Sequence, residues 1–231
     1  MKIGIFTDSH YSSDEITCGN RKNNLSLDKI KEAYRFFEEQ GCELAVCLGD
    51  LVDHEKTHQE EIENLKQAAD VIRSSPLPTL CLMGNHDAFI FTREEFYRIL
   101  GLPEPSEIIL NGKHLFFLDA CYFRDGTHYM PGDSDWENTF YPYTDELKTR
   151  LDGITGDAYI FIHQNLDPDI SNDHRLHNAD KINKILFDSQ KVKTVYQGHY
   201  HPGNKSRHGG IDYVTFPAVC EYENAYFTEE I

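Results

Sequence analysis

The sequence has no long apolar run, no paired cysteines and little positive charge, and each absence argues against a class of protein. No run approaches the roughly 20 apolar residues that a membrane-spanning helix needs. No signal-peptide pattern precedes the first predicted strand, so we expect a cytoplasmic protein without membrane attachment. None of the six cysteines forms a Cys-x-x-Cys pair, which favours free thiols over a disulfide framework or a cysteine-based zinc site.

The balance of charge is strongly acidic. The chain carries 22 Lys and Arg against 39 Asp and Glu, a formal net charge of -17. Such a charge argues against stable binding to nucleic acid or to an anionic membrane. The length of 231 residues, with 39% hydrophobic residues and no visible repeat or linker, predicts a single domain over 1–231.

Hydrophobic periodicity predicts alternating strands and helices, followed by a strand-rich end. Strands are expected at 2–7, 44–48, 79–83, 107–110, 114–118, 158–162, 192–197, 205–208 and 211–216, and helices at 25–39, 59–73, 92–100, 143–152 and 178–188. Asn111-Gly112 and Gly209-Gly210 are typical of tight hairpin turns. Segments 11–24 and 120–142 show no periodicity, and loops of such length usually serve a function.

Five of the predicted strands end in residues that commonly bind metal ions. In chain order these endings are Asp8-Ser9-His10, Gly49-Asp50-Leu51-Val52-Asp53, Gly84-Asn85-His86-Asp87, His163, and Gly198-His199-Tyr200-His201. Ligands of open α/β sheets bind beyond the carboxyl ends of the strands, so we expect these side chains to converge at one edge. Each fragment alone is a common turn sequence, whereas the five together are unlike a chance arrangement.

Convergent Asp, His and Asn side chains without a thiolate suit Mn, Fe, Co or Zn ions. Two such ions bridged by a carboxylate acidify a water, which then attacks a phosphate ester. A nearby proton donor must neutralise the leaving oxygen. The pattern therefore predicts a hydrolase with two divalent transition-metal ions.

These motifs resemble those of the calcineurin-like metallophosphoesterase family over nearly the whole chain. The resemblance implies an α/β fold, a four-layer α/β/β/α sandwich with two mixed sheets. It implies that one ion binds Asp8, His10 and His201, that the other binds Asn85, His163 and His199, and that Asp50 bridges them. It also implies that His86 is the general acid and that Asp53 orients it by a hydrogen bond. Asp87 is expected to be a turn residue that forms hydrogen bonds.

Sequence details favour a small nucleotide-type substrate, with a phosphodiester or pyrophosphate bond to be cleaved. His54-Glu55 follows Asp53 where phosphoprotein phosphatases carry Arg-Gly, and the chain is similar to cyclic-nucleotide phosphodiesterases and manganese-dependent ADP-ribose diphosphatases. Tyr122 or Trp136 of the 120–142 loop could stack on a base. Two alternatives stay open: a phosphomonoesterase, including a protein phosphatase, and a non-catalytic scaffold of the same fold that binds protein partners. The other histidines are expected to be solvated or structural, although His174 and His177 could approach substrate.

Overall fold

Two β-sheets stacked face to face form the centre of the structure, a computed structural model that describes residues 1–13, 18–133 and 138–231. The first sheet has the strand order β10-β1-β2-β3, with β1 at Lys2–Phe6, β2 at Leu44–Cys47, β3 at Thr79–Cys81 and β10 at Tyr226–Glu230. The three early strands are parallel to one another, and β10 runs antiparallel to β1. The sheet is therefore mixed, as the resemblance implies.

The second sheet is also mixed and has the order β4-β5-β6-β7-β9-β8. Its strands are β4 at Glu107–Leu110, β5 at Lys113–Leu118, β6 at Ala158–Ile162, β7 at Val192–Gln197, β8 at Asn204–His208 and β9 at Ile211–Thr215. The turns Asn111-Gly112 and Gly209-Gly210 join the antiparallel pairs β4–β5 and β8–β9, with positive φ at all four residues. Both predicted hairpins are confirmed.

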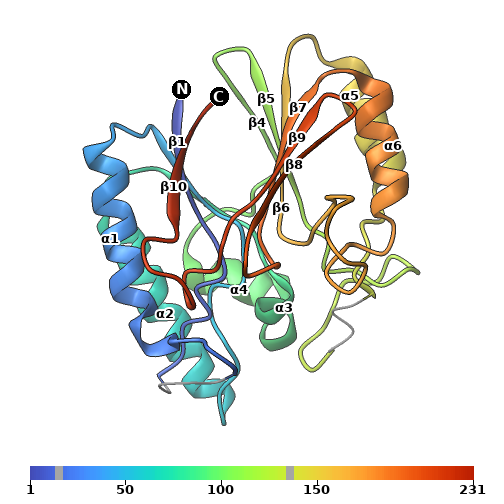
Figure 1. Cartoon of the computed structure of the whole chain (residues 1–231). Helices are drawn as coiled ribbons and strands as arrows, with labels where there is room; N and C mark the ends of the chain where they lie inside the picture. Colours follow the sequence, from blue (N-terminus) through green and yellow to red (C-terminus); the bar gives the residue numbers. More distant parts are fainter. Residues whose placement is uncertain (14–17, 134–137) are drawn as a thin grey trace.

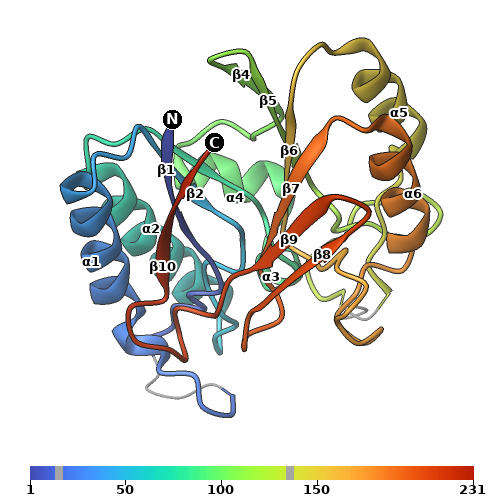
Figure 2. The ribbon, with the colours of Figure 1, turned by 45° about the horizontal axis from the view of Figure 1, so that its top comes forward.

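Helices cover the outer face of each sheet, which completes the four layers (Figures 1 and 2). Beside the first sheet lie α1 at Ser26–Glu39, α2 at His58–Ser74, α3 at Asn85–Ile90 and α4 at Arg93–Leu100, while α5 at Thr144–Gly153 and α6 at Ala179–Ser189 lie beside the second. A 3₁₀ turn at Asn23–Leu25 leads into α1. Within the described ranges, no helix is both long and apolar enough to cross a bilayer.

The alternation of strand side chains produces three separate cores. In β1, Ile3 and Ile5 point between the two sheets, whereas Phe6 packs with α1 in the outer core. In β5, Leu115 and Phe117 point between the sheets, and Phe116 packs under the helices of the second sheet. A strand that is buried on both faces needs apolar residues at every position, which explains why these strands are continuous apolar runs.

Two elements differ from the sequence-based expectations. The β10 strand lies in the polar segment Tyr226–Glu230, where the sequence predicts no strand. It forms by pairing with β1 at the other end of the sequence, and a local pattern does not report such a distant contact. The Gly84-Asn85-His86-Asp87 segment is not only a turn, because its residues from Asn85 onward begin the short helix α3. Both termini lie side by side at the same end of the first sheet (Figures 1 and 2), where the Met1 amino group donates to the Ile231 carbonyl oxygen at 2.8 Å.

Candidate dinuclear metal centre

The five ligand-bearing loops meet beyond the carboxyl ends of strands from both sheets. They follow β1, β2 and β3 of the first sheet and β6 and β7 of the second, on the side of the molecule where α3 lies (Figure 1). Backbone hydrogen bonds fasten the loops together: Asp8 N donates to Gly49 O at 3.0 Å, and Gly198 N donates to His163 O at 3.0 Å. The backbone thus brings together side chains that are up to about 190 residues apart.

The first group of donor atoms surrounds Asp8. Its Oδ1 atom lies 3.7 Å from Nε2 of His10 and 3.5 Å from Nε2 of His201. The two imidazole Nε2 atoms are themselves 3.2 Å apart. Asp50 Oδ2 lies 3.5 Å from His10 Nε2, so its carboxylate also faces this group.

The second group lies on the other side of Asp50. His163 Nε2 is 3.2 Å from Asp50 Oδ2 and 3.1 Å from Asn85 Oδ1. Asp50, His163 and His199 offer ligand atoms that all lie within 4.8 Å of one another. Asp50 Oδ2 therefore faces both donor groups, the position that a bridging carboxylate needs.

Hydrogen bonds within the protein do not satisfy all of these donor atoms, and the orientation of the rings suits bound metal ions. Asp8 Oδ1 is fully buried and accepts no hydrogen bond, although an unsatisfied buried carboxylate oxygen costs about 1–3 kcal/mol or more. His163 turns its Nδ1 to the Leu48 carbonyl at 3.0 Å, and His201 turns its Nδ1 to Glu221 Oε1 at 2.6 Å. These outer contacts leave Nε2 of both rings for an ion, the arrangement that orients histidines in metal sites.

The backbone of the candidate ligands is strained. Seven described non-glycine residues have a positive φ, and four of them are candidate ligands: Asp8, His10, Asp50 and His199, with φ values of 52°, 42°, 52° and 65°. Such left-handed conformations cost free energy in L-residues and persist at functional sites where the surroundings hold them. Their concentration at four of the seven candidate ligands indicates that the fold is organised around these side chains.

Two of the glycines that precede candidate ligands are required by close packing. A Cβ atom at Gly84 would lie 2.1 Å from Asp50 Oδ1, and one at Gly198 would lie 2.6 Å from Asp8 Oδ2. Any side chain at these positions would displace a carboxylate of the site. The two glycines are thus part of the geometry of the centre.

His86 lies beside the donor groups with its orientation fixed by Asp53. Its Nδ1 is 3.1 Å from Asp53 Oδ1, and its ring meets the His10 ring edge-on at 4.5 Å between centroids. Asp53 Oδ2 in turn accepts from Arg21 at 3.0 Å and from Asn23 at 3.3 Å. Four backbone and side-chain donors therefore hold Asp53, since the His54 N–H also bonds to its Oδ1 atom at 3.0 Å.

The pKa shifts without bound ions suit a cation site. Burial, the largest influence, followed by the charge of His86, lowers the pKa of His10 to about 4, and burial followed by the charge of His163 lowers that of His199 to about 3. Burial also acts to lower the pKa of His163, but the neighbouring Asp50 carboxylate outweighs it and raises the value to about 9. Burial acts to raise the pKa of Asp50, yet the surrounding histidines hold it below its usual range. Metal ions bind neutral imidazoles and charged carboxylates, so His10, His199 and Asp50 are in the binding form, whereas an ion would have to displace the proton of His163.

A cavity of about 700 Å³ opens onto the centre. The residues that line it include Asp50, Asn85, His86, His199 and His201 of the centre, together with Arg21 and His174. Pockets of about 300–1,000 Å³ hold drug-sized ligands, so this one has room for a small nucleotide.

Several residues singled out in the sequence lie elsewhere or play other parts. Asp87 is confirmed as a hydrogen-bonding residue: its carboxylate accepts from the backbone N–H groups of Gly84, Leu51 and Val52 and so joins two of the loops. Burial, followed by the charge of Asp50, raises its pKa to about 7. The expectation that Tyr122 stacks on a base is wrong, because Tyr122 is not among the residues that line the cavity at the centre and its hydroxyl bonds to Arg93 and Tyr143 instead. Trp136 lies outside the described residues.

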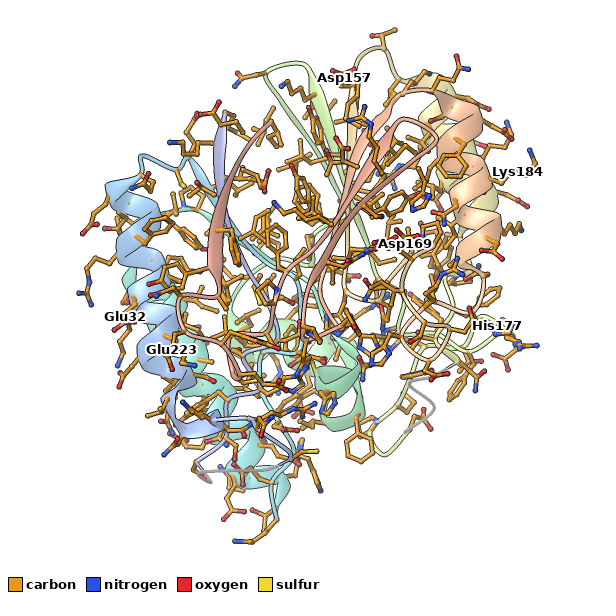
Figure 3. All side chains as sticks on the ribbon, in the orientation of Figure 1. Glu32, Asp157, Asp169, His177, Lys184 and Glu223 are labelled. Carbon is orange, nitrogen blue, oxygen red and sulfur yellow. The ribbon has the colours of Figure 1, made fainter. Side chains whose placement is uncertain are left out.

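Some of the remaining histidines line the large cavity, and others lie away from it. His174 lines the large cavity, as its position after His163 suggested, and His54 also lines it. His177 contacts Arg124 instead and lies at the periphery of the molecule (Figure 3). His58, His114 and His128 pair with Glu61, Glu107 and Asp119 respectively, and serve packing rather than the centre.

Sequence reasoning missed the outer partners of the centre. Glu221, which contacts His201, and Asn23, which contacts Asp53, carry no motif and follow no strand end. Glu221 comes near His201 only because the chain after β9 turns back over the first loop, where Cys220 N donates to Asp8 O at 3.1 Å. No local pattern reports a contact of that kind.

Comparison with known proteins agrees with the geometry. A sequence model of the calcineurin-like phosphoesterase family matches residues 1–203, and the chain belongs to this family of metal-dependent phosphoesterases. A Psychrobacter arcticus protein named "Probable cyclic nucleotide phosphodiesterase" is 24% identical over 196 residues, which cover 83% of this chain and 67% of that protein. A similarly named Fibrobacter succinogenes protein is 25% identical over 219 residues, covering 87% and 73%.

Among solved structures, a dimetal phosphatase from Danio rerio superposes with a TM-score of 0.81 at 17% identity, covering 95% of this chain and 88% of that one. At this identity the likeness shows the fold alone. The expected α/β sandwich with two mixed sheets is confirmed. The roles of the individual ligands stay predictions, which the distances above support.

Proposed function

We propose that this protein hydrolyses small nucleotide-type phosphodiesters and that His86 donates the proton to the leaving oxygen. The observation that carries the proposal is the position of His86. It is fixed by Asp53 at the wall of the cavity, directly beside the donor groups that Asp50 joins. The names of the two curated relatives support the choice of a cyclic or other small diester.

The residues would divide the work as follows. Asp8, His10 and His201 would hold one ion, Asn85, His163 and His199 the other, and Asp50 would contact both. Two ions so held supply charge neutralisation for the phosphate and acidify a water. His86 also offers a ligand atom near those of His10 and Asp50. Burial acts to lower the pKa of His86, but the carboxylates of Asp50 and Asp53 outweigh it and raise the pKa. We therefore assign His86 to proton donation, because a protonated imidazole has no lone pair for an ion. Breaking the P–O bond consumes one water and gives a phosphomonoester and a hydroxyl group, which stay in one molecule when the diester is cyclic.

Charge in the cavity favours a diester over a pyrophosphate or a monoester. Among the residues that the structure describes, Arg21 is the one Lys or Arg in the cavity wall, and Asp53 already pairs with it. A diester carries one negative charge, which the ions can neutralise. A substrate with further phosphate charges would need cations that the wall does not supply.

A substrate panel tests the proposal. With Mn²⁺ supplied, kcat/KM for 3′,5′-cyclic AMP and bis-p-nitrophenyl phosphate should exceed that for AMP and ADP-ribose by about tenfold or more, equivalent to about 1.4 kcal/mol. Preference for AMP would instead support the phosphomonoesterase alternative, and preference for ADP-ribose a pyrophosphatase. Folded, metal-loaded protein that hydrolyses none of the four would support a scaffold.

Asp53→Asn tests the orienting role of Asp53. The variant should retain both metal ions but lower kcat for cyclic AMP by about tenfold to a hundredfold, because the His86 ring loses its charged partner. If Asp53 acts only through His86, the Asp53→Asn/His86→Ala double variant should be no slower than His86→Ala alone. Additive losses, or loss of an ion from Asp53→Asn, would show that Asp53 acts in another way.

A further inference from the structure

A second, smaller cavity adjoins the candidate centre on the side of His86. Its volume is about 210 Å³, and it shares Asp53, His54, Asn85 and His86 with the larger cavity. Phe89, Tyr129 and Asp133 form the part that the larger cavity lacks. A volume of this size is below the roughly 300–1,000 Å³ of pockets that hold a whole drug-sized ligand, so it would receive one ring of a larger molecule.

The aromatic walls of this cavity are held in place before any ligand arrives. Phe89 is on α3, one turn after His86, and it is half-buried with its ring edge-on to His54 at 5.4 Å between centroids. The carbonyl oxygen of Phe89 accepts from Gly132 N at 2.7 Å, which fastens the 120–142 loop to α3. Tyr129 is 1% exposed and packs on Phe123 at 4.4 Å between ring centroids. A preorganised aromatic wall binds a ring with little loss of side-chain entropy.

The carboxylates around the cavity disfavour a second phosphate group. Its lining contains the carboxylates of Asp53 and Asp133, and among the described residues it contains no Lys or Arg. Asp133 Oδ2 accepts from Met130 N at 2.7 Å, so the loop backbone fixes the position of its carboxylate. A second phosphate would be repelled here, whereas a neutral ring with N–H groups at its edge would be accepted.

We propose that the cavity walled by Phe89 and Tyr129 is the site for the nucleobase of the substrate. The inference rests on the proposed function, because it takes a phosphate bound at the donor groups as its starting point. His86 lines both cavities, so the sugar of a nucleotide would pass this residue on the way from phosphate to base. The 120–142 loop thus contributes to specificity through Tyr129 and Asp133, while Phe89 supplies the stacking face.

Equilibrium binding to the Mn²⁺-loaded protein tests the site without requiring turnover. AMP and ribose 5-phosphate share a phosphate and a ribose but differ in the base. Calorimetry should show that AMP binds the wild-type protein about 5- to 150-fold more tightly, the range expected when one base stacks on an aromatic side chain. In Phe89→Ala the dissociation constants for AMP and ribose 5-phosphate should differ by no more than about threefold.

Three controls make the result specific. Phe89→Leu keeps the apolar packing of α3 and should lose most of the ratio while retaining the wild-type melting temperature. Phe36→Ala removes a half-buried phenylalanine from α1, away from both cavities, and should leave the ratio unchanged. Ribose 1,5-bisphosphate should bind no more tightly than AMP, because the smaller cavity repels a second phosphate.

The outcomes separate this inference from the proposed function. Equal binding of AMP and ribose 5-phosphate by wild type, or an unchanged ratio in both Phe89 variants, would overturn the base site even if diesters are hydrolysed. Tighter binding of the bisphosphate than of AMP would mean that the cavity takes a phosphate, and would also overturn it. A protein that keeps the predicted ratio but hydrolyses no diester would refute the proposed function and leave the base site in place.

Discussion

Asp50→Asn is expected to abolish binding of both metal ions and to reduce hydrolysis by roughly a thousandfold or more, since bound metal ions supply several kcal/mol of transition-state stabilisation. Asp50 Oδ1 accepts from the His86 backbone N–H at 2.8 Å, while Oδ2 lies between His10 and His163. An amide has only one oxygen. If that oxygen keeps the bond to His86, the NH₂ group faces both ion positions and offers no lone pair.

Elemental analysis and thermal unfolding measure this effect. Wild type should hold two Mn²⁺ ions. At free Mn²⁺ of 100 times the dissociation constant, binding stabilises the folded state by about 2.7 kcal/mol, which corresponds to a rise in Tm of about 5–10 °C for a chain of this size. Asp50→Asn should show neither the ions nor the rise. Asp70→Asn makes the same chemical change at an exposed position of α2 and should behave as wild type. Two ions retained in Asp50→Asn would show that this carboxylate does not bridge.

His86→Ala is expected to lower kcat for 3′,5′-cyclic AMP by about 10²–10⁴-fold, the range for removal of a general acid. The loss should be far smaller for bis-p-nitrophenyl phosphate, because p-nitrophenolate leaves without needing a proton. Metal content should stay at the wild-type value. The His86 backbone N–H, which holds Asp50, is still present in alanine.

The dependence on the leaving group distinguishes proton donation from general damage to the site. His177→Ala, a change at an exposed histidine that contacts Arg124, should leave both rates unchanged. Equal losses on the two substrates in His86→Ala would contradict proton donation. They would indicate that His86 contributes to phosphate binding instead.

The strand ends were predictable because each is a local pattern. Apolar runs such as Ala158–Ile162 are buried on both faces of a sheet, and polar residues can follow only where the strand leaves the core. The direction of the parallel strands then brings their endings to one side. The two hairpin turns were predictable for the same reason, because Asn-Gly and Gly-Gly adopt positive φ without needing distant contacts.

Features that depend on distant contacts were not predictable. Tyr226–Glu230 is a polar segment that becomes a strand only because β1 offers an unpaired edge. Left-handed backbone at Asp8 and Asp50 follows from the packing of neighbouring loops, not from the preference of aspartate. The second cavity could not be predicted from the sequence around Phe89, since its neighbours Tyr129 and Asp133 come from a distant segment without periodicity.

The backbone bonds from the end of the chain to its first loop determine when the centre can form during synthesis. Thr7 and Asp8 accept hydrogen bonds from Val219 and Cys220, and Glu221 orients His201. At about 5–20 residues per second, a ribosome needs roughly 10–40 s to travel between these segments. Until the later segment has been made, Asp8 and His10 lack the backbone that supports them. We therefore expect metal ions to bind the proposed centre only after β10 has paired with β1.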